Sequence, residues 1–132
     1  ERDMMKHTVL LIAMAILFVG CGTMSQRPFR PAVINHLVFF SLLDPEERYE
    51  LIGDCDSDLS TIDGIVSYWC GEHGEFGRSK VDGDYDVGLY VGFDSNDAYN
   101  QYLNHPNHLS LVDKWKNRWG WIRIHDVVDE TP

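Results

Sequence analysis

The chain is poor in basic residues. Lysine and arginine together number 11 against 21 aspartates and glutamates, which gives a formal net charge of -10. Proteins that bind nucleic acid or anionic lipid present clustered lysine and arginine to phosphates. No basic stripe of this kind is present, so the charge balance argues against both partners for the folded domain.

The sequence also lacks an apolar run of membrane-spanning length. The unbroken apolar run Thr8–Val19 has about 12 residues, whereas a spanning helix needs about 20. Positive charge at Arg2 and Lys6 precedes this run, and Gly20-Cys21 follows it at once. Because this is the three-part layout of a secretory signal, we predict that residues 1–20 are a signal peptide that is removed.

The end of that run resembles the processing box of bacterial lipoproteins, in which a cysteine is acylated and becomes the new N-terminus. Leu17-Phe-Val-Gly-Cys21 fits it, except that Phe18 replaces the usual leucine. The resemblance predicts lipidation of Cys21, a polar tether over 21–32 and a folded domain over 33–129. It implies a protein of the bacterial cell envelope that faces the periplasm or the exterior and touches the membrane through its lipid anchor only. A plain signal peptide with an incidental cysteine is the alternative.

Cysteine is scarce, with three in the chain. Lipidation of Cys21 leaves Cys55 and Cys70 as a pair in an oxidising compartment. Counted from the turn at Asp63, Cys55 lies about 12 Å back along a helix and Cys70 about 23 Å along a strand, whereas a disulfide requires Cα atoms within about 7 Å. We favour two buried free thiols, with a disulfide as the alternative if Gly53 shortens the helix.

No complete metal-binding motif is present. Asp54-x-Asp56-x-Asp58 begins like a calcium loop, but Leu59 stands where the loop needs glycine and Ile65 where it needs glutamate. The chain's histidines have no cysteine or carboxylate at a recognisable ligand spacing. We therefore predict neither a metal site nor a cofactor.

Apolar residues are plentiful, at 44% with 12% aromatic, which is enough for a packed core. Breaker-free runs rich in β-branched and aromatic residues predict strands at 33–42, 65–71, 85–93 and 119–128. Helical spacing of apolar residues predicts a helix over 44–63, with Leu51, Cys55, Leu59 and Ile62 buried, and a helix from 94 that Pro106 breaks. A further helical piece would bury Leu109, Val112 and Trp115.

This order, β-α-β-β-α-β, is the split layout of ferredoxin-like folds, so the class is α+β. Such a fold has a four-stranded antiparallel sheet with helices on one face. We place Val38, Phe40 and Trp121 on the bare face, which exposes too much apolar area for a monomer and predicts a two-fold homodimer. Trp115, Trp119 and Trp121 are then expected in the core and the interface; a stacking platform for a ring or a sugar is the alternative.

Several motifs, taken in order, resemble the stress-responsive dimeric α/β-barrel (Dabb) family. They are His36-Leu-Val-Phe-Phe, Gly64-Ile followed by Gly71, Gly77-Arg-Ser, Tyr85-Asp and Tyr102-Leu-Asn-His-Pro-Asn-His108. The resemblance spans about 34–128 and implies a ferredoxin-like protomer whose dimer closes into an α/β barrel, with a cavity between each sheet and its helices. We predict that a ligand pocket is formed by His36, Val38, Phe40, Gly88, Tyr90, Gly92 and His105, because two glycines on one strand face leave space.

The resemblance also implies candidate catalytic residues. A polyketide cyclase that shares the motif has its catalytic tyrosine and histidine at positions matching Tyr102 and His108, and a first-strand histidine matching His36. His108 would remove a carbon-bound proton beside a carbonyl, and Tyr102 would orient it or hydrogen-bond the developing oxyanion. His36, His105 and His108 could also converge on a metal. In the alternative interpretation, these residues have structural roles only: His105 caps the broken helix and Tyr102 is a core residue.

Three functions remain open from the sequence. We favour binding of a small apolar or aromatic compound in the barrel cavity, without catalysis. The alternatives are an enzyme that performs histidine and tyrosine acid–base chemistry on a carbonyl compound, and a structural envelope protein whose cavity is filled by its own side chains.

Overall fold

The computed structural model describes residues 28–130. The predicted signal peptide, the lipidation site Cys21 and most of the tether lie outside these residues. The elements in chain order are β1 (Ile34–Leu42), η2 (Pro45–Glu47), α2 (Arg48–Asp58), β2 (Ile65–Glu72), β3 (Val87–Phe93), α3 (Asn96–Leu103), α4 (Pro106–Trp115) and β4 (Trp119–Val128). The predicted β-α-β-β-α-β order is confirmed, with α4 as the helical piece that follows Pro106.

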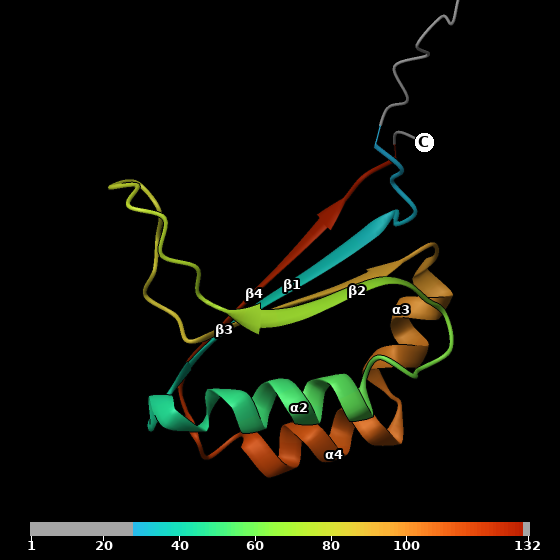
Figure 1. Ribbon diagram of the computed structural model, residues 1–132. Helices are drawn as coiled ribbons and strands as arrows, with labels where there is room; N and C mark the ends of the chain where they lie inside the picture. Colours follow the sequence, from blue (N-terminus) through green and yellow to red (C-terminus); the bar gives the residue numbers. More distant parts are fainter. Residues whose placement is uncertain (1–27, 131–132) are drawn as a thin grey trace, which may run out of the picture.

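The four strands form one antiparallel sheet in the order β2-β3-β1-β4. The helices lie together on one face of this sheet, as Figure 1 shows. The sequence patterns explain the helix starts, because the Asp44 side chain accepts a hydrogen bond from the Glu46 N–H and Ser95 caps α3 in the same way. The opposite face of the sheet carries no helix from the described residues.

The two faces of β1 are the reverse of our assignment for Val38 and Phe40. Both residues point toward the helices and are buried at 4% and 3% exposure, so placing them on the bare face was wrong. Both faces of β1 carry apolar residues, so the sequence pattern could not indicate which face the helices cover. Trp121 does lie on the helix-free face, where it borders Phe39.

The buried stripe of α4 also differs from the prediction. Leu111 and Trp115 are buried, whereas Leu109 is exposed. Trp115 anchors α4 to α2, because its indole N–H donates to the Asp54 carboxylate at 2.7 Å. The Arg118 guanidinium lies 3.6 Å from the Trp115 ring centroid and forms ion pairs with Glu47 and Glu50. Packing and charge together hold the two long helices side by side.

Cys55 and Cys70 are free thiols in this structure, Cys55 buried and Cys70 half-buried. A hydrogen bond with Cys70 and then burial raise the pKa of Cys55, which keeps it a protonated and weakly nucleophilic thiol. Within residues 28–130, the helices are all too short or too polar to cross a membrane.

Candidate functional site

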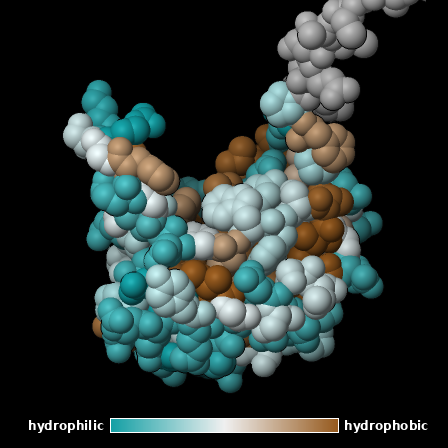
Figure 2. Space-filling model, in the orientation of Figure 1, coloured by the Kyte–Doolittle hydropathy of each residue, from teal (hydrophilic) through white to brown (hydrophobic). Residues whose placement is uncertain are grey.

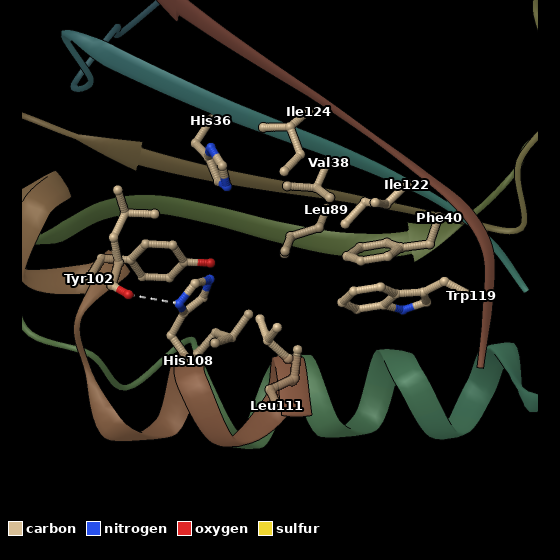
Figure 3. A pocket seen from close by; sticks show the side chains of 13 residues that line it. His36, Val38, Phe40, Leu89, Tyr102, His108, Leu111, Trp119, Ile122 and Ile124 are labelled. Atoms are coloured by element: carbon tan, nitrogen blue, oxygen red, sulfur yellow. Dashed lines mark hydrogen bonds between the residues drawn. The ribbon is translucent and has the colours of Figure 1, made fainter. Parts of the chain in front are cut away.

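A cavity of about 270 Å³ lies between the sheet and the helices. Figure 3 shows its walls, with β1, β3 and β4 above, α4 below and α3 at the end that carries Tyr102. Nine purely hydrocarbon side chains, the Trp119 indole and three side chains with titratable groups line it: His36, Val38, Phe40, Leu59, Leu89, Tyr102, Leu103, His108, Leu111, Val112, Trp119, Ile122 and Ile124. The polar side chains gather at one end, and the tilted rings of Phe40 and Trp119 close the other.

His108 comes from the first turn of α4 and points up into the polar end of the cavity (Figure 3). Its Nδ1 lies 3.1 Å from the Leu103 carbonyl oxygen, which can only accept a hydrogen bond. Nδ1 therefore carries the proton, and the Nε2 lone pair faces the cavity. Burial lowers the pKa of His108 below its ordinary value of 6.5, although the Leu103 hydrogen bond acts in the opposite direction. His108 is consequently a neutral imidazole at neutral pH, the form that accepts a proton.

His36 enters the same end of the cavity from β1 and is only 3% exposed. Its Nδ1 lies 2.6 Å from a carboxylate oxygen of Asp126, the residue directly opposite it in the β1–β4 register. The Tyr99 hydroxyl donates to the other Asp126 oxygen at 2.9 Å. Because a carboxylate accepts, His36 donates through Nδ1, and its Nε2 is directed toward Tyr102 and His108.

Asp126 and Tyr99, which contact His36, both have shifted pKa values. Burial would raise the pKa of Asp126, but the hydrogen bonds from His36 and Tyr99 outweigh it and lower that pKa. Burial and the Asp126 hydrogen bond raise the pKa of Tyr99 to about 12. Asp126 is thus an anion and Tyr99 a neutral donor at neutral pH, and both hold His36 in one orientation. Neither was foreseen, because only the strand register brings Asp126 opposite His36.

The Tyr102 ring packs against both histidine rings. Its ring centroid is 5.9 Å from that of His36 and 4.6 Å from that of His108. Burial raises the pKa of Tyr102, so its hydroxyl keeps its proton. Figure 3 shows this hydroxyl pointing into the cavity. An O–H donor beside two imidazoles can hydrogen-bond a carbonyl oxygen and stabilise negative charge that develops on it.

The structure separates the other predicted pocket residues from this cavity. Gly88, Tyr90 and Gly92 lie on the helix-free face of β3, and side chains occupy the space that the glycines leave. A Cβ at Gly92 would stand 2.1 Å from the Ser67 hydroxyl, which exchanges a hydrogen bond with Tyr90, while the Trp69 ring packs over Gly88 and stacks on Tyr90. The glycines permit close packing of the protein itself rather than of a ligand.

His105 does not line the cavity either. Its Nδ1 accepts a hydrogen bond from the Asn107 N–H, which makes His105 the N-cap of α4. Among residues 28–130, no group of three metal-ligating side chains is close enough to hold an ion. Of the three histidines considered as joint metal ligands, His36 and His108 line the cavity and His105 caps α4.

Comparison with solved structures defines the class of fold. A Dabb-family protein with a ferredoxin-like fold from Mesorhizobium loti is 26% identical, has a TM-score of 0.62 and aligns over 74% of this chain and 97% of its own. A dimeric ferredoxin-like protein of unknown function from Thermobifida fusca is 18% identical, with a TM-score of 0.62 over 79% and 97% of the two chains. The hydroxynitrile lyase of Passiflora edulis is 17% identical, with a TM-score of 0.62 over 78% and 99%. The chain is thus a ferredoxin-like α+β protein.

The particular family follows from the sequence match. Residues 34–129 match the model of the stress responsive A/B barrel domain, and the chain belongs to this family. No curated protein matches the chain. Below 25% identity, the structural likeness to the lyase establishes the fold alone.

Proposed function

We propose that the protein binds a small apolar or aromatic compound in the cavity, with the compound's polar group placed between His36, Tyr102 and His108. One observation carries this proposal. The cavity of about 270 Å³ has a largely apolar lining, and its titratable side chains meet at one end. Ligand sites commonly combine an apolar wall with a few convergent polar groups. An open cavity also favours binding over the purely structural alternative, which requires a filled one.

Filling the cavity tests the binding proposal. Val38 lies in the cavity wall, and Val38→Trp would occupy much of the space that a bicyclic ketone such as 1-tetralone needs. We expect the dissociation constant for 1-tetralone, measured by NMR titration, to rise at least tenfold, roughly 1.4 kcal/mol or more. Val81→Trp, in an exposed loop, adds the same volume outside the cavity and should leave binding unchanged. Equal affinity in the two variants would place the bound ketone elsewhere.

The neutral tautomer of His108 favours a second candidate function, acid–base chemistry on a bound carbonyl compound. Nε2 of His108 presents a lone pair at the point where the Tyr102 hydroxyl can receive a carbonyl oxygen. This pairing suits removal of a proton from the carbon beside the carbonyl, since the negative charge moves onto an oxygen that Tyr102 can hydrogen-bond.

The helix-free face of the sheet supports the proposal that the protein is a homodimer closed into an α/β barrel. Apolar and aromatic side chains lie along this face, namely Leu37, Phe39, Trp69, Tyr90 and Trp121. Trp69 is 49% exposed, and Figure 2 shows hydrophobic residues gathered above the hydrophilic helical layer. Two similar solved structures are described as dimeric. A second copy that packs its own helix-free face here would bury this surface.

A charge on the helix-free face should weaken such a dimer. Trp121 is half-buried beside Phe39, and Trp121→Glu would replace a large aromatic contact with a carboxylate inside the proposed interface. We expect the dimer dissociation constant from analytical ultracentrifugation to rise by roughly 100-fold or more. Leu109→Glu, on the exposed side of α4, is the matched control and should leave the dimer intact. A wild-type protein that sediments as a monomer would contradict the barrel.

The lipoprotein-like box at Cys21 supports placement of the domain at the bacterial cell envelope through a lipid anchor. In the described chain, the two terminal segments leave the domain at the same end (Figure 1), where Arg30 and Asp129 form an ion pair. The mass of the N-terminal peptide from the membrane fraction tests this placement, because an unmodified Cys21 would exclude the anchor.

A further inference from the structure

The cavity contains two imidazoles that approach one space from opposite walls. His36 descends from β1 in the sheet, and His108 rises from α4 in the helical layer (Figure 3). Each uses Nδ1 for a hydrogen bond outside the cavity, His36 to Asp126 and His108 to Leu103, and each directs Nε2 inward. A planar group lying between sheet and helices would have one imidazole above it and one below it.

The two imidazoles have different partners, and the difference assigns them different roles. The Asp126 carboxylate lies 2.6 Å from Nδ1 of His36, so it would balance the positive charge that arises when Nε2 holds a proton. His108 has only the neutral Leu103 carbonyl as its partner, with Tyr102 as the adjacent donor and His36 and His105 as the nearby imidazoles. His36 is therefore suited to donate a proton from Nε2, and His108 to accept one at Nε2.

We propose that His108 and His36 invert a carbon centre beside the carbonyl group of the bound compound, by taking its proton from one face and returning another to the opposite face. This inference rests on the proposed function, since the compound must first occupy the cavity. Its substrate class is an apolar or aromatic aldehyde or ketone with one hydrogen on a branched carbon beside the carbonyl.

The proposed step is balanced in protons and electrons. The His108 Nε2 lone pair takes the proton, and the C–H electron pair forms the enolate, whose oxygen accepts the Tyr102 O–H hydrogen bond. The enolate carbon then takes the proton from His36 Nε2 on the other face, and the carbonyl re-forms. His108 ends as imidazolium and His36 as neutral imidazole, and exchange with solvent restores both. No oxidant or metal takes part.

Deuterium labelling of a chiral ketone distinguishes inversion from simple exchange. We would incubate the full-length protein with one enantiomer of 2-methyl-1-tetralone in D₂O and analyse both enantiomers by chiral chromatography and mass spectrometry. The inference predicts that the inverted ketone carries one deuterium while the remaining starting enantiomer is unlabelled early in the reaction. Deuterium that enters the starting enantiomer without inversion would contradict the proposal that His108 and His36 act on opposite faces. A ketone that binds without any exchange would contradict it as well.

Two variants and one control separate the role of His36 from that of His108. His36→Gln should slow inversion at least about 100-fold, while His108 still exchanges deuterium into the starting enantiomer on its own face. Asp126→Asn, which keeps a side-chain oxygen that can accept the His36 Nδ1–H, should slow inversion roughly 10-fold or more and shift the ¹⁵N resonances of the His36 ring, because the charge-balancing carboxylate is gone. His125→Gln, one residue away on the helix-free face, should change neither. Unchanged inversion in both test variants would overturn the role of His36.

Binding is measured separately from turnover, by NMR titration of the same ketone. A protein that does not bind the ketone would overturn the proposed function and this inference with it. A protein that binds the ketone but exchanges from one face would leave the proposed function standing and refute only the two-histidine step.

Discussion

Trp115→Ala is expected to lower the free energy of unfolding by about 3–5 kcal/mol, the range for removing a fully buried large aromatic side chain. Trp115 has no exposed surface and joins α4 to α2 and the sheet. Its removal leaves a void and deprives the Asp54 carboxylate of the indole donor at 2.7 Å. The Arg118 guanidinium also loses the ring beneath it. Urea denaturation followed by circular dichroism measures this change.

Leu109→Ala provides the comparison within the same helix. Leu109 is 53% exposed, so its truncation should change the free energy of unfolding by no more than about 0.5 kcal/mol. The difference between the two variants tests the helix face that the structure assigns, since our sequence pattern had placed both residues in one buried stripe. Similar losses for Leu109→Ala and Trp115→Ala would contradict this packing of α4.

His108→Gln should slow deuterium exchange at the carbon beside the carbonyl of 1-tetralone by roughly 10² to 10⁴-fold, the usual contribution of a general base. Glutamine can keep a hydrogen bond to the Leu103 carbonyl but has no basic nitrogen for the cavity. Proton NMR of the ketone in D₂O measures the exchange, and the dissociation constant should change little because most of the lining is untouched. Equal exchange rates in the variant and the wild type would remove His108 from the chemistry.

The same reaction should depend on pH in a defined direction. The reactive form of His108 is the neutral imidazole, and burial lowers the pKa of His108 below 6.5. Protonation removes the base, so the rate should fall as the pH drops and reach half of its upper limit at a pH below 6.5. A half-maximal rate at or above pH 6.5 would show that a different group accepts the proton.

The sequence allowed the main parts of the cavity to be named. The order of strands and helices follows from hydrophobic periodicity and from capping residues such as Asp44 and Ser95, which act locally and can be recognised in one dimension. His36, Tyr102 and His108 came from the motif resemblance, and the structure brings all three to one end of the cavity. Local signals thus identified the scaffold, and the motif resemblance identified the three polar side chains.

Features that depend on non-local pairing could not be read in the same way. Asp126 is 90 positions from His36, and only the β1–β4 register places the two opposite each other. Phe39 and Phe40 are equally apolar, so their alternation did not distinguish the helix-covered face from the bare one. Gly88 and Gly92 indicated space, but the Trp69 and Ser67 side chains that use it come from β2.

Native mass spectrometry of the protein purified from its own host tests the functional cavity most directly. We predict that the wild type carries a small apolar or aromatic compound, up to one for each protomer, or takes up added 1-tetralone, and that denaturation releases it. Val38→Trp, produced in the same way, should carry none. A wild-type protein that is empty and also takes up no 1-tetralone would contradict a ligand-binding cavity.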